Sequence, residues 1–66
     1  MNIGTSVRVM CAKTGSKQKE LAEDLGITQQ YLLKIMRDNR FVKEDRLKDM
    51  AAFFGVSVSE FIKAGE

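Results

Sequence analysis

The stretch that decides the fold runs from residue 18 to residue 37 and reads QKELAEDLGITQQYLLKIMR. Its apolar residues recur at the spacing of two short helices that each bury one face, and they are Leu21, Leu25, Ile27, Leu32 and Ile35. Gly26 stands where the first helix must end, because a residue without Cβ adopts a positive φ at little cost. Thr28 follows as a candidate N-cap, since its hydroxyl can accept a bond from an orphaned backbone N–H. The pattern therefore predicts two helices joined by a tight turn.

Ala22 lies where the two predicted helices cross, and its small side chain lets their backbones approach. Two apolar helical faces joined at a glycine turn are typical of a helix-turn-helix, whose second helix can enter a DNA major groove. The outward residues of that second helix then matter for function. They are Gln29, Gln30, Leu33, Lys34 and Arg37.

This outward face contains no acidic residue, whereas the first helix carries Glu20, Glu23 and Asp24. Glutamine has a donor and an acceptor that match the N7 and N6 edge of adenine, and lysine and arginine supply donors to guanine or phosphate. The contrast favours a nucleic-acid surface over a plain solvated face. Two alternatives stay open: Leu33 contacts a thymine methyl or packs on a neighbouring helix, and Tyr31 contacts a phosphate or covers the core edge.

The chain has 66 residues, which suffice for one domain over residues 1–66. Its formal net charge of +2 and pI of 8.9 are too mild to identify a nucleic-acid binder, which typically has a pI above about 9. The placement of charge is more informative. Basic residues flank the motif at Lys13, Lys17, Lys19, Lys34, Arg37, Arg40 and Lys43. The carboxylates of the last third are expected to lie away from the DNA side, at Glu44, Asp45, Asp49, Glu60 and Glu66.

Composition excludes several protein classes. No apolar run approaches the roughly 20 residues that span a bilayer, and the N-terminus lacks the charged and apolar segments of a signal peptide. The single cysteine forms no internal disulfide, which fits a reducing cytoplasm. Without histidine, neither a His-assisted nucleophile nor a His-containing metal site can be built. We therefore expect a cytoplasmic protein that is not an enzyme and has no metal, cofactor or small-molecule ligand.

Helix-period apolar residues throughout the chain and the absence of proline predict an all-α fold, a compact five-helix bundle. The first helix is expected to begin at Asn2 or Thr5 and to end at residues 14–16, where the sequence reads TGS. The second and third helices are expected over residues 17–25 and 29–37. The buried stripe of the first helix consists of Ile3, Val7, Met10 and Cys11.

The last third of the chain is predicted to form two more helices. The fourth spans residues 44–54 and stops at Gly55. Ser57 begins the fifth, which runs to Lys63, because Ser57 and Glu60 have the spacing of a capping box. The inner stripe of the fourth helix consists of Leu47, Met50, Ala51 and Phe54.

These residues resemble the Cro/CI-type helix-turn-helix of lambdoid phage repressors and the wider XRE-like regulators. The matching positions are Gln18, Leu21, Ala22, Gly26 and Thr28, and in the tail Leu47, Met50, Ala51, Phe54, Gly55, Val56, Ser57 and Phe61. The resemblance covers nearly the entire chain and implies a lambda repressor-like DNA-binding domain. It implies that Gln18 holds a phosphate and braces the first glutamine of the recognition helix. It further implies that Gln29, Gln30 and Lys34 read bases and that the loop after the third helix contacts the DNA backbone.

Two positions depart from the pattern of this family. Lys17 stands where the family prefers Ser or Thr as N-cap, so Ser16 is an alternative cap that would shift the helix start by one residue. Asp38 and Asn39 replace the glycine that is common after the recognition helix. An aspartate near phosphate is unfavourable unless it points away or pairs with a neighbouring arginine.

We therefore expect a sequence-specific, double-stranded DNA-binding transcriptional regulator, a Cro-like repressor from a phage or mobile element. It would bind a two-fold operator as a weak homodimer or as a dimer formed on DNA, because one recognition helix reads few base pairs. The expected base contacts are Gln29, Gln30, Leu33 and Lys34. The expected phosphate contacts are Lys17, Gln18, Lys19, Thr28, Tyr31, Arg37, Asn39, Arg40 and Lys43.

A protein-interaction module of the same fold is the alternative function, such as an antitoxin subunit or an antirepressor. Apolar surface residues would then matter more than the glutamines, namely Leu33, Phe41, Val42, Phe53 and Ile62. Phe41 and Val42 either plug the core or form a dimer contact. Salt separates the two functions, because DNA binding weakens steeply as salt rises and an apolar protein interface does not.

Overall fold

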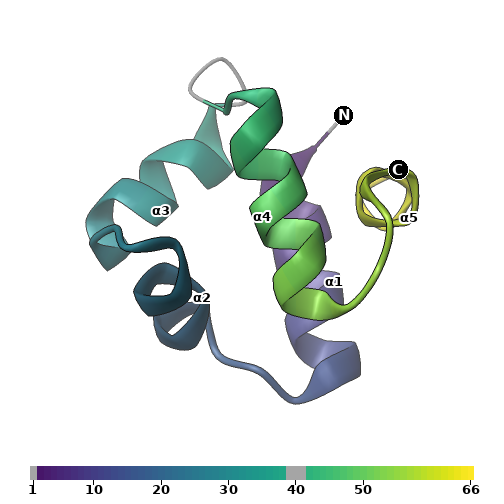
Figure 1. The fold of residues 1–66 in the computed structure, drawn as a ribbon, viewed down its shortest axis with the longest axis horizontal. Helices are drawn as coiled ribbons and strands as arrows, with labels where there is room; N and C mark the ends of the chain where they lie inside the picture. Colours follow the sequence, from purple (N-terminus) through teal and green to yellow (C-terminus); the bar gives the residue numbers. More distant parts are fainter. Residues whose placement is uncertain (1, 39–41) are drawn as a thin grey trace.

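The computed structural model describes residues 2–38 and 42–66, and these form five α-helices (Figure 1). In chain order the helices are α1 (Ile3–Thr14), α2 (Gln18–Leu25), α3 (Gln29–Arg37), α4 (Glu44–Phe54) and α5 (Val58–Lys63). The predicted all-α fold is confirmed, and each predicted helix occurs at nearly the expected residues. None of the described helices has the length and apolar character needed to cross a membrane.

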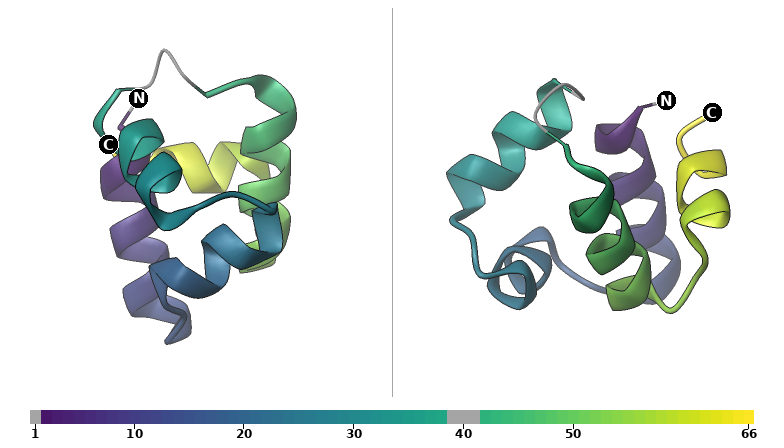
Figure 2. Two further views of the ribbon diagram at one scale, coloured as in Figure 1. Left: turned by 90° about the vertical axis from the view of Figure 1, so that its left-hand side faces the viewer. Right: turned by 45° about the horizontal axis from the view of Figure 1, so that its top comes forward.

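The helices α1 and α4 lie at the centre of the molecule, with α2 and α3 on one side and α5 on the other (Figures 1 and 2). α1 packs against α3, α4 and α5, while α4 also packs against α2 and α5. The helix-turn-helix formed by α2 and α3 is therefore supported by two helices that lie outside the motif.

Every helix contributes to one buried core. Its side chains are at most 9% exposed and are Ile3, Val7, Met10, Leu21, Ala22, Leu32, Ile35, Met36, Leu47, Met50, Ala51, Phe54 and Phe61. The stacked rings of Phe54 and Phe61, with centroids 5.9 Å apart, join α4 to α5. Half-buried Phe53 contacts Phe54 edge-on, with centroids 5.1 Å apart. The apolar stripes predicted for α1, α3 and α4 thus face this core.

Helix α1 begins after Asn2, not at Thr5. The side-chain Oδ1 of Asn2 accepts a bond of 3.0 Å from the backbone N–H of Thr5. This bond satisfies one of the first N–H groups of the helix, which have no partner within the helix. Cys11, expected on the buried stripe, is half-buried and packs against the edge of the core.

The N-cap of α2 is Lys17, so the alternative of a cap at Ser16 is wrong. The Ser16 hydroxyl oxygen accepts a bond of 2.9 Å from the Thr14 hydroxyl instead. At the start of α2, the backbone N–H of Lys17 donates to Oε1 of Glu20 over 2.9 Å. A lysine side chain has no acceptor, so this contact is the half of a capping box that Lys17 can form.

The turn between α2 and α3 begins at Gly26, whose φ is +70°. Its N–H reaches the carbonyls of Ala22 and Glu23, and the N–H of Ile27 donates to the Ala22 carbonyl over 3.0 Å. These bonds satisfy the free carbonyls at the end of α2 and turn the chain sharply. α3 starts immediately afterwards with Thr28 as its N-cap.

Two glycines allow backbones to touch. A Cβ atom on Gly4 would lie 2.6 Å from the carbonyl oxygen of Met36, so the backbone of α1 lies directly against the end of α3. A Cβ atom on Gly65 would overlap the carbonyl oxygen of Asn2 and the hydroxyl of Ser6, so the two chain ends meet on α1. Neither position has room for a side chain without movement of its neighbours.

Candidate nucleic-acid interface

The outer face of α3 carries the residues that the sequence places there. The exposed side chains of this helix are Gln29, Gln30, Tyr31, Leu33, Lys34 and Arg37. The inner side chains Leu32, Ile35 and Met36 are buried in the core. Leu33 keeps 42% of its surface exposed, which favours the open alternative over packing on another helix.

A shallow depression of about 380 Å³ lies on this face and is lined by Gln30, Leu33, Lys34, Arg37 and Asp38. The structure thus brings together three of the four predicted base contacts, since these residues are three or four positions apart on one helix. Asp38 also lines the depression and is half-buried at the end of α3. Its backbone is extended, with φ at −137°, and its N–H donates to the Lys34 carbonyl over 3.1 Å.

The start of α3 is fixed by Thr28. The hydroxyl oxygen of Thr28 accepts a bond of 3.0 Å from the backbone N–H of Tyr31. This cap places Gln29 and Gln30 in the first turn of the helix, where the remaining free N–H groups and the positive end of the helix dipole favour an anion. The two glutamines are therefore next to a backbone that suits a phosphate.

The start of α2 holds three predicted phosphate contacts. Lys17 and Lys19 are exposed, while Gln18 is half-buried at the first position of the helix. Glu20, also in the first turn, accepts the bond from the Lys17 backbone described above. The two lysine side chains thus extend from a short segment whose backbone is held in place.

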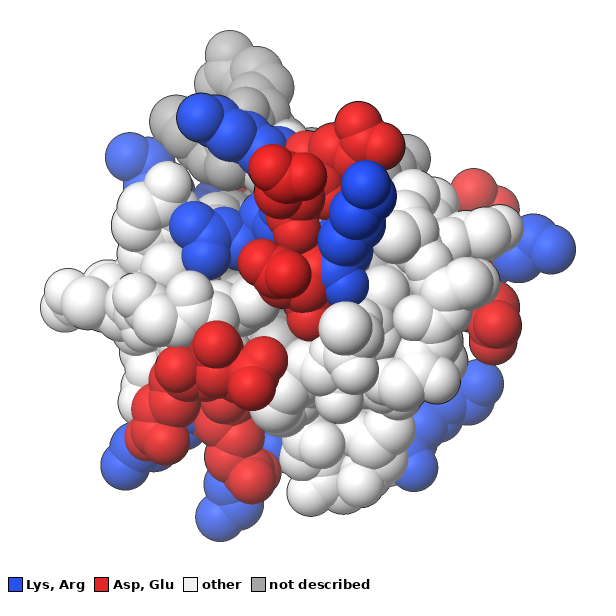
Figure 3. Space-filling model, viewed as in Figure 1, with Lys and Arg blue, Asp and Glu red and all other residues white. Residues whose placement is uncertain are grey.

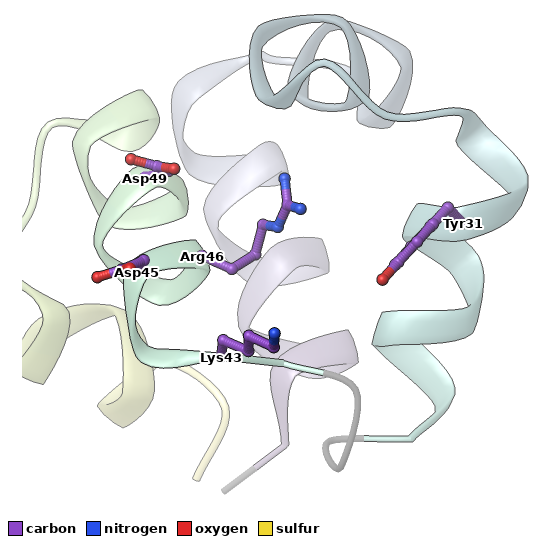
Figure 4. A pocket seen from close by; sticks show the side chains of 5 residues that line it. All are labelled: Tyr31, Lys43, Asp45, Arg46 and Asp49. Carbon is purple, nitrogen blue, oxygen red and sulfur yellow. The ribbon is translucent and has the colours of Figure 1, made fainter.

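A second depression, of about 280 Å³, lies between α3 and the start of α4 (Figure 4). Its lining comes from Tyr31 on α3 and, on the α4 side, from Lys43, Asp45, Arg46 and Asp49. The sequence led us to expect the carboxylates of the last third away from the DNA side. Asp45 and Asp49 nevertheless line the same depression as Tyr31 and Lys43, two predicted phosphate contacts. Which side of the molecule faces DNA stays a prediction.

Arg46 is a residue that sequence reasoning missed. Its Nη1 atom donates to the carbonyl oxygen of Leu25 over 3.2 Å, so it links α4 to the last residue of α2. The two residues are 21 positions apart, and no local pattern indicates their contact. The one sequence signal is the lack of a basic residue in the last turn of α2, because a helix C-terminus favours a cation.

The charged side chains are unevenly distributed over the surface. In the view of Figure 3, acidic side chains gather over α4 and, at lower left, over α2, while the upper left over α3 is uncharged or basic. The exposed acidic residues of these two helices are Glu20, Glu23, Asp24, Glu44, Asp45 and Asp49. The predicted contrast between an acidic α2 and an acid-free α3 thus holds on the folded surface.

Two predicted phosphate contacts, Asn39 and Arg40, lie outside the described residues, as does Phe41. Val42 is half-buried and packs against the core, which favours core packing over a dimer contact for this residue. The assignment of individual residues to bases or phosphates stays a prediction.

Metal-ligating side chains and the cysteine thiol would be separate candidate sites. The described residues contain no group of three or more His, Cys, Asp or Glu side chains placed to hold a metal ion. Burial raises the pKa of the Cys11 thiol above its ordinary value, and the negative charge of Glu20 raises it further. This thiol is therefore protonated at neutral pH, in contrast to a reactive cysteine, whose pKa is lowered.

Comparison with known proteins points to the same motif. A family model described as helix-turn-helix matches residues 9–61, which include α2, α3, α4, the second half of α1 and most of α5. No match is found among curated proteins or among solved structures. Because the family model covers most of the chain, the protein belongs to the Cro/CI-type, XRE-like helix-turn-helix family of DNA-binding transcription regulators.

Proposed function

We propose that this protein is a Cro-like repressor of a phage or mobile element that binds a two-fold operator through α3. The observation that carries the proposal is the outer face of α3, where Gln29, Gln30, Leu33 and Lys34 are exposed beside a buried apolar stripe. Glutamine and lysine side chains in a major groove can distinguish base pairs by their donor and acceptor pattern. A helix that served only to support the core would not need this composition.

Sequence is read by the α3 side chains, and register is set by contacts to phosphate. The side chains available for phosphate flank α3 on two sides. Lys17, Gln18 and Lys19 extend from the start of α2, and Tyr31 and Lys43 line the second depression. One α3 helix contacts too few base pairs for specificity in a genome, so two copies on a two-fold site are expected.

The experiment is a selection of duplexes from a random DNA pool with the full chain, followed by titration of the best duplex and a scrambled duplex of the same composition. We expect a consensus with two inverted half-sites about one helical turn apart. We also expect binding that weakens steeply as salt rises. Recovery of unrelated sequences, bound equally to the scrambled duplex, contradicts sequence-specific binding.

The alternative is a protein-interaction module, and the exposure of Leu33 and Tyr31 favours it. These are the two large hydrophobic side chains that the described surface leaves exposed, at 42% and 45%. A partner protein covering α3 would bury both. The titration in salt separates the alternatives, because association through these residues would change little with salt while DNA binding would fall steeply.

A further inference from the structure

The bond from Arg46 to Leu25 joins two helices that are not neighbours in sequence. It spans 3.2 Å from the guanidinium Nη1 to the carbonyl oxygen, and its surroundings are partly buried. Figure 4 shows the Arg46 side chain extending away from the α4 ribbon. Arg46 thus reaches from outside the helix-turn-helix to the residue just before its turn.

The Leu25 carbonyl lies at the negative end of α2. The last carbonyls of a helix have no partner within the helix, and the dipole leaves partial negative charge there. The N–H groups of Gly26 and Ile27 donate to the carbonyls of Ala22 and Glu23. The last turn of α2 has no basic residue. A positive charge at this end therefore comes from another helix, and Arg46 supplies it.

The turn that follows Leu25 sets the direction of α3. Residues 26–28 separate the two helices, so a small rotation of the Leu25 peptide would change the angle at which α3 leaves the turn. The other end of α3 is held where the Met36 carbonyl lies against Gly4 of α1. The recognition helix is thus fixed to the rest of the protein near both ends, by α4 before it begins and by α1 where it finishes.

We propose that Arg46 is a positioning residue for DNA recognition: its bond to Leu25 holds the turn so that Gln29 and Gln30 meet the base edges at a fixed angle. The inference rests on the proposed function and assigns a role in specificity to a side chain of α4. Base readout depends on hydrogen-bond geometry, while phosphate contacts tolerate small rotations. Arg46 therefore contributes to the difference in affinity between operator and non-specific DNA, not to affinity for both.

The test uses three variants of the full chain. Arg46→Met keeps the aliphatic stem and removes the donor and the charge, and Arg46→Lys keeps the charge. Lys48→Met is the matched control, because Lys48 is an exposed residue of the same helix and loses the same charge. Affinity is measured on the best selected duplex and on its scrambled counterpart at several salt concentrations. The ¹³C chemical shift of the Leu25 carbonyl reports directly on the bond.

We expect Arg46→Met to shift the Leu25 carbonyl signal and to lower affinity for the selected duplex by about tenfold more than for the scrambled one. The dependence of its DNA affinity on salt should equal that of Lys48→Met. Lys48→Met itself should leave the Leu25 signal and the preference for the selected duplex unchanged. Across all variants, a larger change in the Leu25 carbonyl chemical shift should go with a smaller ratio of affinities for the selected and scrambled duplexes. If Arg46→Met is too unstable to measure, Arg46→Lys tests the same correlation.

Two results overturn the proposal. In the first, Arg46→Met weakens both duplexes equally and its salt slope falls by about one relative to Lys48→Met, which makes Arg46 a phosphate contact. In the second, a variant moves the Leu25 carbonyl signal, which shows that the bond is lost, and still prefers the selected duplex as strongly as the parent does. If the parent protein itself prefers no duplex, the proposed function fails. The Leu25 signal then still reports whether Arg46 holds the turn.

Discussion

Gln30 and Lys19 are proposed to make two different kinds of DNA contact, Gln30 to a base edge and Lys19 to a phosphate. Both are exposed, so substituting either one should leave the melting temperature close to that of the parent. Gln30→Ala should cost about 1–3 kcal/mol on the selected duplex and little on scrambled DNA, because it removes a base-reading group. Lys19→Ala should weaken both duplexes alike and reduce the salt slope by about one, because a phosphate contact carries no sequence information.

Titrations of the two variants on both duplexes at several salt concentrations check this contrast. Each variant serves as the control for the other, since one tests sequence readout and the other tests charge. Equal, small effects of Gln30→Ala on the two DNAs would mean that the glutamines only cover a solvated helix face. The protein-interaction module would then be the better account of α3.

Ser6 is a residue whose hydroxyl works against stability. It is fully buried, and its Oγ has no hydrogen-bond partner among the residues that the structure describes. A buried polar group without a partner is destabilising, and alanine also has the higher helix propensity. We expect Ser6→Ala to raise the free energy of unfolding by about 1 kcal/mol, measured by urea denaturation. Ser59→Ala is the control on an exposed helix position, and a Ser6→Ala variant less stable than the parent contradicts the expectation.

At the scale of the helix, the sequence predicted what depends on neighbours along the chain. Gly26 ends α2 with a positive φ, and the Ser57 hydroxyl accepts from the Glu60 N–H over 3.1 Å, as the capping box requires. Both signals lie within three or four residues. The cap of α2 was harder to predict, because Ser16 has the better capping side chain and yet Lys17 is the N-cap, while the Ser16 hydroxyl contacts that of Thr14.

Contacts between distant helices were not predictable in this way. The bond from Arg46 to Leu25 and the depression that Tyr31 shares with residues of α4 both depend on how α4 is placed relative to α2 and α3. Spacing along the chain places a residue on a helix face but does not say which helix faces it. The outer face of α3 could be predicted from the sequence of that helix alone. The depression between α3 and the start of α4 could be found only from the folded structure.

The crossing of α2 and α3 can be tested at Ala22. This side chain is 1% exposed, and its carbonyl accepts the turn bonds of Gly26 and Ile27. Ala22→Leu should overpack the crossing and lower the free energy of unfolding by about 1–3 kcal/mol. Thermal melting measures the effect, with Ala12→Leu as the matched control on the exposed side of α1. Equal melting of the two variants would show that the helices do not cross at Ala22.

At the scale of the whole molecule, apolar surface for self-association is limited. The large hydrophobic side chains exposed on the described surface are Tyr31 and Leu33, both on α3. Val42 and Phe53, which were candidates for a dimer contact, pack against the core. The described surface outside α3 therefore offers only a small apolar interface for a dimer, and small interfaces give weak association.

We thus predict a monomer at nanomolar concentration, with a dissociation constant for the free dimer on the order of micromolar or weaker, and two copies on the operator. Sedimentation of labelled protein across this concentration range, with and without the selected duplex, measures both states. A stable dimer at nanomolar concentration without DNA is incompatible with this prediction.

The contact of Gly65 with Asn2 has a topological consequence. Asn2 and Gly65 lie against each other where α1 begins and the segment after α5 ends (Figure 1). A short peptide linker between these two segments could therefore close the backbone into a ring. Closure restricts the unfolded chain far more than the folded one. We expect the ring to melt at a higher temperature than a linear chain carrying the same linker. Such a ring would offer proteases no free end.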